Sequence, residues 1–414
     1  MRFLGYSAMA LTAAAMISTG SVAPAHAGPA SCDPTCQAAF DQQHRNGLSR
    51  TDFYDPPAPL PLAPVGTLIR RETTDDYVVD GERIRADRIL YHSRTSGGRD
   101  IAASGVLLVP PGTPPEGGWP VVADAHGASG SGVDCAPSLM RDLYHGNQIA
   151  RFVALGYAVV APDYAGLGTT GETELGNKTA EADDVIGAVR SAGQAVADLS
   201  DRWVLWGHSQ GGGAALGVAE RQAVRPDPGY LGAVVTSPAA DLTALVTHTA
   251  ETPSLGGFLP LIARGAEVGD PGVRLDRILT PRALDLLDST RTGCLDVVSA
   301  VYSGLSGSDL VRPDYLSEPG FARFLRENST GTAPVGGPVL LLQGGADALV
   351  TQSVTDTVAA SLCETGSEID YRTYPALGHD TWGGQIGIDD GAMPDILSWT
   401  ADRFAGKPAG STCH

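Results

Sequence analysis

Short apolar runs alternate with longer amphipathic segments along most of the chain after about residue 66. Runs of four to eight mostly apolar residues are typical of strands buried on both faces of a sheet, whereas apolar positions spaced three or four apart indicate helices. This pattern predicts strands at 120–125, 157–161, 203–206, 231–235, 339–343 and 369–374, and helices at 147–155, 181–197 and 396–404. The alternation predicts an α/β fold with a mostly parallel central sheet flanked by helices.

The sheet is expected to begin with antiparallel strands. Apolar segments at 67–70, 86–92 and 102–109 follow one another without a helical segment between them. Gly97 and Gly98 mark a turn between the last two segments. Three strands joined in this way are typical of a meander at one side of the sheet.

Residues 239–333 break the alternation. We find no strand pattern there, but helix-like runs occur at 242–249, 258–266, 282–287 and 295–305. We interpret this segment as a helical cap inserted above the sheet, which divides the core into 67–238 and 334–414. Two apolar groups in the insertion are candidates for lining a path to the active site: Leu255, Phe258, Leu259, Leu261 and Ile262, and Val297, Val298, Val301 and Tyr302.

The N-terminal residues have a different character from the rest of the chain. Residues 1–27 have the features of a secretory signal peptide, with a basic residue at Arg2, an apolar run to Met16 and an A-x-A cleavage site at 25–27. Residues 28–66 are rich in proline, which favours an extended arm lying on the domain over a helix. We therefore expect a secreted, extracellular protein.

Charge and cysteine content narrow the possible partners. The net charge is −19, which disfavours nucleic acid and anionic membranes. Six cysteines in an exported chain suggest three disulfides, whose pairing these considerations leave open. The cysteines are Cys32, Cys36, Cys135, Cys294, Cys363 and Cys413, of which the first two could close a small loop. A zinc site is disfavoured because neither C-x-x-C nor H-E-x-x-H occurs.

The pentapeptide 207–211, GHSQG, carries the strongest chemical signal. It fits G-x-S-x-G, follows the predicted strand 203–206 and precedes a segment of very small residues with helical character. Strand, sharp turn and helix are the context of a nucleophile elbow, in which the turn exposes a serine. Ser209 is therefore the candidate nucleophile.

A serine nucleophile needs a base, and the base needs a carboxylate that orients it. In chains with this elbow, the acid follows the serine and the histidine comes last. Asp347 follows the strand 339–343, and His379 follows the strand 369–374. Asp241 and Asp380 are alternative acids. The other histidines fit less well: His26 lies in the signal, His208 is expected to point away, His248 lies in the insertion and His414 ends the chain.

The same chemistry needs two backbone N–H groups that stabilise an oxyanion. One is expected from Gln210, directly after the nucleophile. The other is expected from the loop that follows strand 120–125. Ala128 is the first candidate and Ser129 the second, whereas His126 is expected to brace this loop.

In these motifs the chain resembles the secretory lipase family, the lipase A type of α/β-hydrolase. The matching pieces are Phe53-Tyr54 with Pro56-Pro57, residues 66–70, His126-Gly127 with 135–138, Asp163-Tyr164 with 166–168, the elbow, Gly345-Ala346-Asp347 and Gly378-His379. They extend from the proline-rich arm towards the C-terminus, so the resemblance covers nearly all of the chain after the signal.

The resemblance implies ester hydrolysis by Ser, Asp and His beneath a helical cap, without a metal or other cofactor. It also implies the disulfides Cys135–Cys294 and Cys363–Cys413. Relatives often carry threonines where this chain has Ala128 and Ser129, so the second oxyanion donor stays open between them.

We therefore expect a secreted serine ester hydrolase, a triacylglycerol lipase or carboxylesterase acting through an acyl-enzyme. Its expected substrate is a small-molecule or lipid ester, its contact with a lipid interface is at most transient, and it is expected to be a monomer. Two alternatives stay open. A secreted serine peptidase would use the same fold and triad, since neither distinguishes an ester from an amide. A non-catalytic binding protein could also keep the fold.

Overall fold

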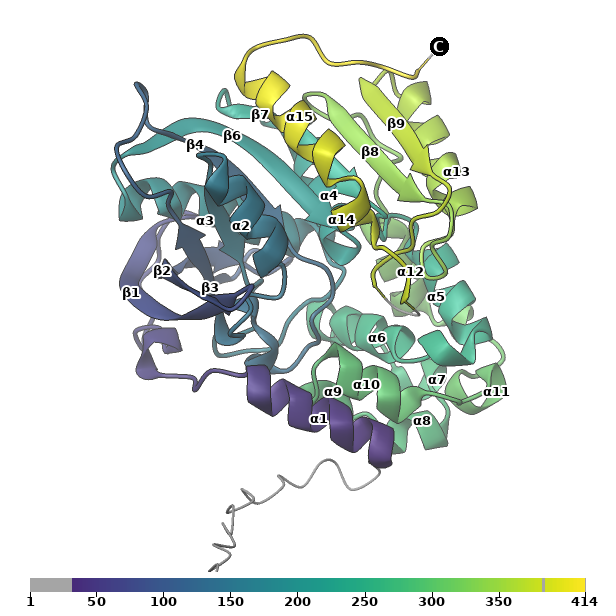
Figure 1. The fold of residues 1–414 in the computed structure, drawn as a ribbon. Helices are drawn as coiled ribbons and strands as arrows, with labels where there is room; N and C mark the ends of the chain where they lie inside the picture. The colour runs from purple at the N-terminus through teal and green to yellow at the C-terminus, as the bar shows by residue number, and fades with distance from the viewer. Residues whose placement is uncertain (1–31, 382–383, 414) are drawn as a thin grey trace, which may run out of the picture.

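In the computed structural model, which describes residues 32–381 and 384–413, the chain forms a nine-stranded sheet (Figure 1). The predicted signal peptide and His414 lie outside these residues. The strands are β1 (Leu68–Val79), β2 (Glu82–Arg94), β3 (Asp100–Leu108), β4 (Trp119–Ala125), β5 (Ala158–Pro162), β6 (Leu199–His208), β7 (Tyr230–Thr236), β8 (Val339–Gly344) and β9 (Ile369–Tyr374). All nine were predicted, although the first was expected to end at Arg70.

The strand order is β1-β2-β3-β5-β4-β6-β7-β8-β9. Pairings along β1-β2-β3-β5 are antiparallel, and those from β5 through β9 are parallel. The antiparallel start and the mostly parallel remainder are therefore as predicted. Since parallel strands place their carboxyl ends at one edge, the loops after β4, β6, β7, β8 and β9 meet there.

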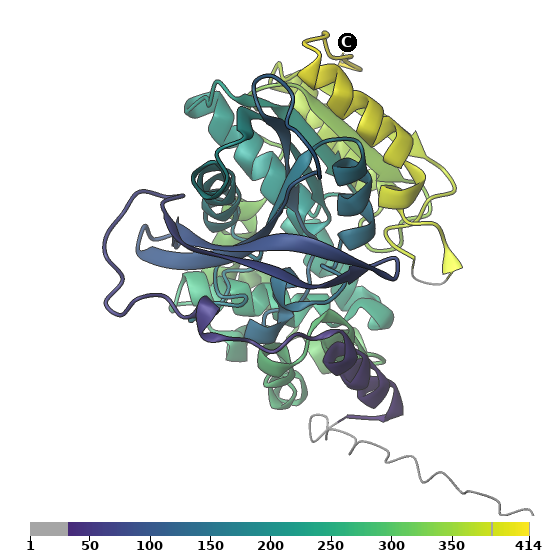
Figure 2. The ribbon, with the colours of Figure 1, turned by 60° about the vertical axis from the view of Figure 1, so that its left-hand side comes forward.

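Helices cover both faces of the sheet (Figures 1 and 2). The helices of one layer are α3 (Lys178–Ala195), α4 (Gln210–Val224) and α13 (Gln352–Glu364), and those of the other are α2 (Gly146–Ala154), α14 (Ile388–Gly391) and α15 (Met393–Phe404). Their apolar faces pack on the sheet in two separate clusters of buried side chains. Burial on both faces explains why the central strands are continuous apolar runs.

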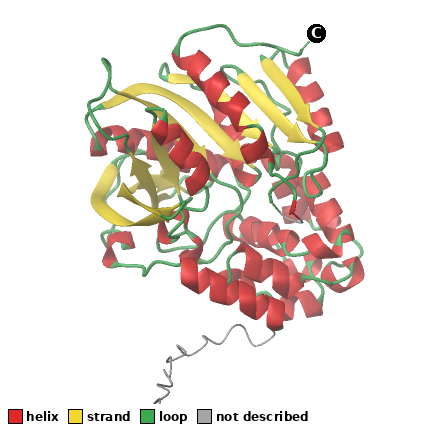
Figure 3. Ribbon diagram, viewed as in Figure 1, coloured by secondary structure: helices red, strands yellow, loops and turns green. Residues whose placement is uncertain are grey.

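A group of helices lies between β7 and β8 in sequence, beyond the carboxyl ends of the strands (Figures 1 and 3). We call this group the cap. Its helices are α5 (Leu242–Glu251), α6 (Phe258–Gly269), α7 (Leu275–Ile278), α8 (Pro281–Asp285), α9 (Ser289–Thr292), α10 (Leu295–Tyr302), α11 (Gly307–Leu310) and α12 (Pro319–Asn328). They bury an apolar core of their own, which includes Val246, Leu259, Val298, Tyr302 and Phe321.

The prediction of an extended arm was wrong for its first part. α1 (Pro34–Asn46) is a helix of 13 residues, and the arm is extended from Gly47 onward apart from a 3-10 turn, η1 (Asp52–Tyr54). Asp33 caps α1 by accepting the Cys36 backbone N–H at 2.8 Å, and Pro34 suits the first helical turn. The overall proline content concealed these local start signals, because the prolines are concentrated beyond residue 55.

Three disulfides are present: Cys32–Cys36, Cys135–Cys294 and Cys363–Cys413. The last two are the pairs that the family resemblance implied. Cys135–Cys294 joins the region after β4 to the start of α10, and so attaches the cap to the core. Among the helices of the described ranges, none is long and apolar enough to cross a membrane.

Candidate active site

Ser209 lies in a tight turn between β6 and α4. Its φ of 56° and ψ of −117° place the backbone in a region that L-residues rarely adopt. The turn is held by the Ser209 N–H, which donates to Thr236 O at 3.0 Å. A side chain at Gly207 would overlap the carbonyl of Gly211, and one at Gly211 would overlap that of Ala125. The two glycines of the motif are thus required by packing around the serine.

Ser209, His379 and Asp347 are hydrogen-bonded in series. Ser209 Oγ lies 2.9 Å from His379 Nε2, and His379 Nδ1 lies 2.8 Å from Asp347 Oδ2. All three residues are buried. The aspartate lies after β8 and the histidine after β9, so three sequence-distant loops at one sheet edge bring the residues together. Each distance is within hydrogen-bonding range, so a proton on Oγ has a base in contact.

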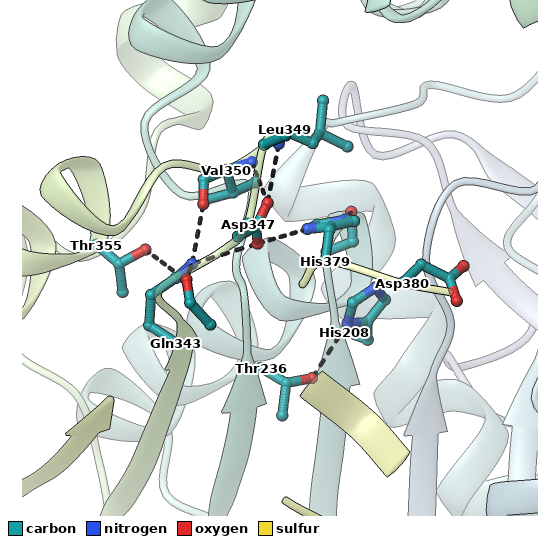
Figure 4. Close-up of polar contacts among 12 residues, drawn as sticks. His208, Thr236, Gln343, Asp347, Leu349, Val350, Thr355, His379 and Asp380 are labelled. Atoms are coloured by element: carbon teal, nitrogen blue, oxygen red, sulfur yellow. Dashed lines mark hydrogen bonds and ion pairs between the residues drawn. The ribbon is translucent and has the colours of Figure 1, made fainter. Parts of the chain in front are cut away.

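The surroundings of Asp347 keep its carboxyl ionised (Figure 4). Its Oδ1 accepts the backbone N–H groups of Leu349 at 2.9 Å and Val350 at 2.8 Å, and its Oδ2 accepts Gln343 Nε2 at 3.2 Å. Burial acts to raise the pKa of Asp347, but the facing His379 imidazole and the hydrogen bond from the Val350 N–H contribute to lowering the pKa below its usual value. An ionised carboxylate can hold the imidazole with its Nδ1 proton toward it.

The alternative acids and bases lie elsewhere or make other contacts. Asp241 is the N-cap of α5, where it accepts the Ala244 N–H at 3.0 Å. His248 lies on α5 with Nε2 2.8 Å from Ala348 O. Asp380 lines the cavity beside Ser209, but it is Asp347 that contacts the imidazole. His26 and His414 lie outside the described residues.

The expectation that His208 points away was wrong. Its ring centroid lies 4.7 Å from that of His379, and its Nδ1 lies 3.1 Å from Asp389 Oδ2. Successive strand residues face opposite sides of a sheet, so His208 shares a face with Trp206, toward α2 and α14. Thr236 Oγ1 also donates to Asp389, at 2.6 Å. The imidazole of His208 therefore forms part of the wall beside the triad.

A further buried histidine and aspartate extend this wall. His145 Nδ1 lies 3.1 Å from Asp124 Oδ1, and the His145 ring lies 6.0 Å from that of His208. Burial acts to lower the pKa of His145, but Asp124 raises it above the ordinary value. Sequence analysis missed Asp124, His145 and Asp389. The local signal was only that Asp124 is a charged residue within an apolar strand.

The two candidates for the second oxyanion donor differ in position. Ala128 lines both cavities that contain Ser209, whereas Ser129 is buried outside them. The Ala128 carbonyl accepts the Tyr144 hydroxyl at 2.7 Å, which fixes this peptide in the loop. Gln210 is the first residue of α4, so its N–H has no acceptor within the helix. Its side chain donates to Glu181 Oε1 at 2.7 Å.

Glu181 is buried, and it lines one of the cavities that contain Ser209 and Gln210. Gly176 N–H donates to the same Oε1 at 2.8 Å. Burial raises the pKa of Glu181 to about 8, despite the hydrogen bonds from Gly176 and Gln210, which act to lower it. At neutral pH the glutamate is therefore largely uncharged. It can anchor the Gln210 side chain without placing a negative charge beside a developing oxyanion.

Two cavities meet at Ser209, and they differ in chemistry. The polar cavity, of about 100 Å³, is lined by Tyr144, His145, Gln148, His208, His379, Asp380, Asp389 and Asp390. The apolar cavity, of about 40 Å³, is lined largely by Leu175, Leu242, Leu245, Leu261, Ile262, Leu349 and Val350. Ala128 and Phe258 border both. Of the cap residues expected near the site, Phe258, Leu261 and Ile262 line these cavities. The other candidates line neither cavity: Leu255, Leu259, Val297, Val298, Val301 and Tyr302.

The assembled groups suit nucleophilic attack on a carbonyl carbon. A serine with a hydrogen-bonded base, an ionised orienting carboxylate and N–H groups at a helix N-terminus are the parts that acyl transfer requires. Within residues 32–381 and 384–413, no three histidine, cysteine or acidic side chains are placed to hold a metal ion.

Comparison with known sequences finds one family model and several relatives that are named as lipases. The model of a family described as secretory lipase matches residues 144–412. A protein of Mycobacterium tuberculosis named "Probable inactive lipase" is 27% identical over 378 residues, which cover 86% of this chain and 82% of its own. Lipase 10 of Candida albicans is 23% identical over 404 residues, covering 88% of this chain and 83% of its own.

Solved structures show the same fold at low sequence identity. Candida antarctica lipase A in its closed state superposes with a TM-score of 0.75 at 18% identity, and 89% of each chain is covered. The rice cell wall degrading esterase LipA of Xanthomonas oryzae gives a TM-score of 0.64 at 19% identity, covering 82% of this chain and 97% of its own. The α/β-hydrolase fold class is thereby confirmed.

Proposed function

Because the chain belongs to the secretory lipase family, we propose that it is an active, exported serine ester hydrolase, a triacylglycerol lipase or carboxylesterase. The observation that carries this proposal is the unbroken series Ser209–His379–Asp347, with contacts of 2.9 and 2.8 Å. Membership of the family and three disulfides support export.

In the acylation step, Ser209 Oγ bonds to the ester carbonyl carbon while its proton passes to His379 Nε2. The carbonyl oxygen becomes an oxyanion, which the backbone N–H groups of Gln210 and Ala128 stabilise. The carbon–oxygen bond to the alcohol then breaks as His379 returns the proton to the leaving oxygen. Each oxyanion donor is typically worth on the order of 10²–10³ in rate.

Deacylation repeats these steps with water. His379 takes a proton from water, the hydroxide adds to the acyl carbon, and the acid leaves as the proton returns to Ser209 Oγ. Asp347 stabilises the imidazolium in both half-reactions. No metal or other cofactor takes part in this proposal, and the protein acts as a monomer with at most transient contact to a lipid interface.

Ester and amide substrates separate this proposal from the peptidase alternative. Hydrolysis of p-nitrophenyl butyrate is expected, together with negligible turnover of peptide p-nitroanilides. Ser209→Ala should remove the ester activity while leaving the circular dichroism spectrum unchanged. Preferential cleavage of anilides would favour the peptidase. Equal ester hydrolysis by the wild type and by Ser209→Ala would place the activity elsewhere.

A non-catalytic role is the second candidate, because one similar protein carries the name "Probable inactive lipase". The contacts among Ser209, His379 and Asp347 favour activity, since a binding protein has no need of a base in contact with a serine hydroxyl. No turnover of any ester tested, from a protein whose fold is intact, would favour the non-catalytic role.

A further inference from the structure

The two cavities at Ser209 lie on different sides of the nucleophile. The polar cavity contains His379 and His208, and the apolar cavity contains Gln210 and the leucines of the cap. An ester bound at Ser209 has an acyl part and an alcohol part that extend in different directions from the carbonyl carbon. The structure therefore offers one cavity for each part.

The position of the proton donor indicates which cavity holds the alcohol part of the ester and which holds the acyl part. His379 must protonate the oxygen of the departing alcohol, and a general acid acts only on an atom within hydrogen-bond reach. His379 lines the polar cavity and is absent from the lining of the apolar one. The alcohol part is therefore expected in the polar cavity, and the acyl chain in the apolar cavity beside Leu261 and Ile262.

The wall of the polar cavity combines carboxylates with imidazole, amide and hydroxyl groups, among them those of His208, Gln148 and Tyr144. The carboxylates of Asp380, Asp389 and Asp390 line it. Asp389 is paired with His208 at 3.1 Å, and Asp390 with Arg151 at 3.3 Å. Asp380 is exposed at the mouth and accepts only the adjacent Thr381 N–H among the hydrogen bonds of the described residues, at 2.6 Å. Because Asp389 and Asp390 already have basic partners, Asp380 is the carboxylate from which an alkyl group at this wall would displace water without replacing its hydrogen bonds.

Resting on the proposed ester hydrolysis, we propose that the alcohol part of the substrate is a small polyol with free hydroxyl groups, as in a monoester of glycerol. Free hydroxyls can donate to the Asp380 carboxylate, and about 100 Å³ has room for several water-sized groups. Further acyl chains on the alcohol would enter a polar space. Monoesters are therefore preferred over fully acylated glycerol.

A series of butyrate esters tests this assignment, because the acyl part stays constant. The esters are glyceryl 1-monobutyrate, propyl butyrate, tributyrin and butyrylcholine, all below their solubility limits. We expect kcat/KM for the monobutyrate to exceed that for propyl butyrate by about tenfold, which is the value of one hydrogen bond to a charged group. A ratio near one, or preference for tributyrin, would overturn the proposal. Preference for butyrylcholine would replace the polyol by a cation.

Substitution of Asp380 shows whether the preference for the monobutyrate arises from binding of its hydroxyls or from the intrinsic reactivity of the ester. Asp380→Leu should lower the ratio of monobutyrate to propyl butyrate toward one, and Asp380→Asn should lower it less. Asp288→Leu is the matched control, because the Asp288 side chain is 95% exposed on the cap and outside both cavities. Its ratio should equal that of the wild type. An unchanged ratio in Asp380→Leu would contradict the assignment.

The partitioning of the acyl-enzyme between water and an added alcohol gives an independent test of which alcohol the polar cavity binds. In deacylation an added alcohol occupies the leaving-group position, so glycerol should intercept the butyryl-enzyme formed from p-nitrophenyl butyrate better than propanol at equal concentration. Equal interception would overturn the polyol assignment. Absence of p-nitrophenol release would instead disprove the ester hydrolysis on which it rests.

Discussion

At the scale of single residues, the site depends on contacts that hold an unfavourable backbone in place. Ser209 has a positive φ of 56°, and its carbonyl accepts the N–H groups of Gly213 and Ala239 at 3.1 and 2.9 Å. None of these bonds involves the serine hydroxyl. The turn and the fold should therefore survive removal of Oγ, which makes Ser209→Ala a clean test of chemistry.

The identity of the orienting acid is testable with two matched substitutions. Asp347→Asn can still accept the N–H groups of Leu349 and Val350, but its amide cannot hold the Nδ1 proton of His379. We expect kcat/KM to fall by roughly 10²–10⁴. Asp241→Asn keeps its capping role on α5 and should be near wild type. The opposite result would exclude Asp347 as the orienting acid.

The buried Glu181 predicts a specific pH dependence of stability. Its pKa is about 8 in the folded protein, against 4.5 for the free side chain. Between these pH values the native state retains a proton that the unfolded chain has lost, so stability falls as pH rises. Glu181→Gln has no such proton. As pH rises through this range, the free energy of unfolding of Glu181→Gln should increase relative to that of the wild type by about 1.4 kcal/mol per pH unit.

Urea denaturation of both proteins at several pH values from 5 to 8 measures this difference. A difference that stays constant with pH would show that Glu181 titrates normally. The wild type alone is not informative, because burial also raises the pKa of Asp163 and Asp184, to about 6 and about 7.

At the scale of elements, one disulfide and several hydrogen bonds attach the cap to the core near the oxyanion loop. The disulfide is Cys135–Cys294, and Leu295 N–H donates to Ser129 O at 2.9 Å beside it. α1 packs along α10, and Gln43 Nε2 donates to Thr292 O at 3.2 Å while its Oε1 accepts Cys294 N–H at 2.8 Å. These links place the cap over the oxyanion loop.

Disulfide removal should affect stability according to loop length. Cys135–Cys294 spans 159 residues and Cys32–Cys36 spans 4. On the chain-entropy estimate, replacing the first pair by alanine should lower the free energy of unfolding by about 5 kcal/mol, and replacing the second by about 2 kcal/mol. Denaturant titration of the two double variants compares them. A larger loss for the short loop would contradict the entropic account.

The cap also sets the expected acyl preference. Leu261 and Ile262 on α6 line the apolar cavity, in which each buried methylene contributes about 0.8 kcal/mol. We expect kcat/KM to rise from acetyl to butyryl p-nitrophenyl esters. Leu261→Trp should fill the cavity and remove this rise while acetate turnover persists. Leu155→Trp, at a position 60% exposed on the core, is the control. A flat profile in the wild type would contradict this role.

Elements were predicted well where their signals are local. Strands β4 to β8 contain apolar runs, and α2, α3 and α15 have regular apolar spacing, so their positions follow from short segments. The 13-residue helix α1 was not predicted, because composition over 28–66 was given more weight than the Asp33-Pro34 start signal. α12 was also missed, although Glu318 and Pro319 form a similar start.

At the scale of the whole molecule, Ser209, Asp347 and His379 could be singled out because each follows a recognisable strand in a fixed order. The neighbouring wall could not. His208 meets Asp389 only because the end of β6 lies beside α14, about 180 positions later in the chain. Likewise, the separation of a polar and an apolar cavity depends on how the cap and the loop after β9 close over one sheet edge.

The most direct test of the central claim, that Ser209 is an activated nucleophile, is labelling with a fluorophosphonate followed by mass spectrometry. We predict one adduct per chain, located on the peptide containing Ser209, with concurrent loss of p-nitrophenyl butyrate hydrolysis. His379→Ala should label far more slowly at the same residue, since the base would be absent. A correctly folded wild-type protein that gains no adduct, or gains it at another residue, would contradict the account.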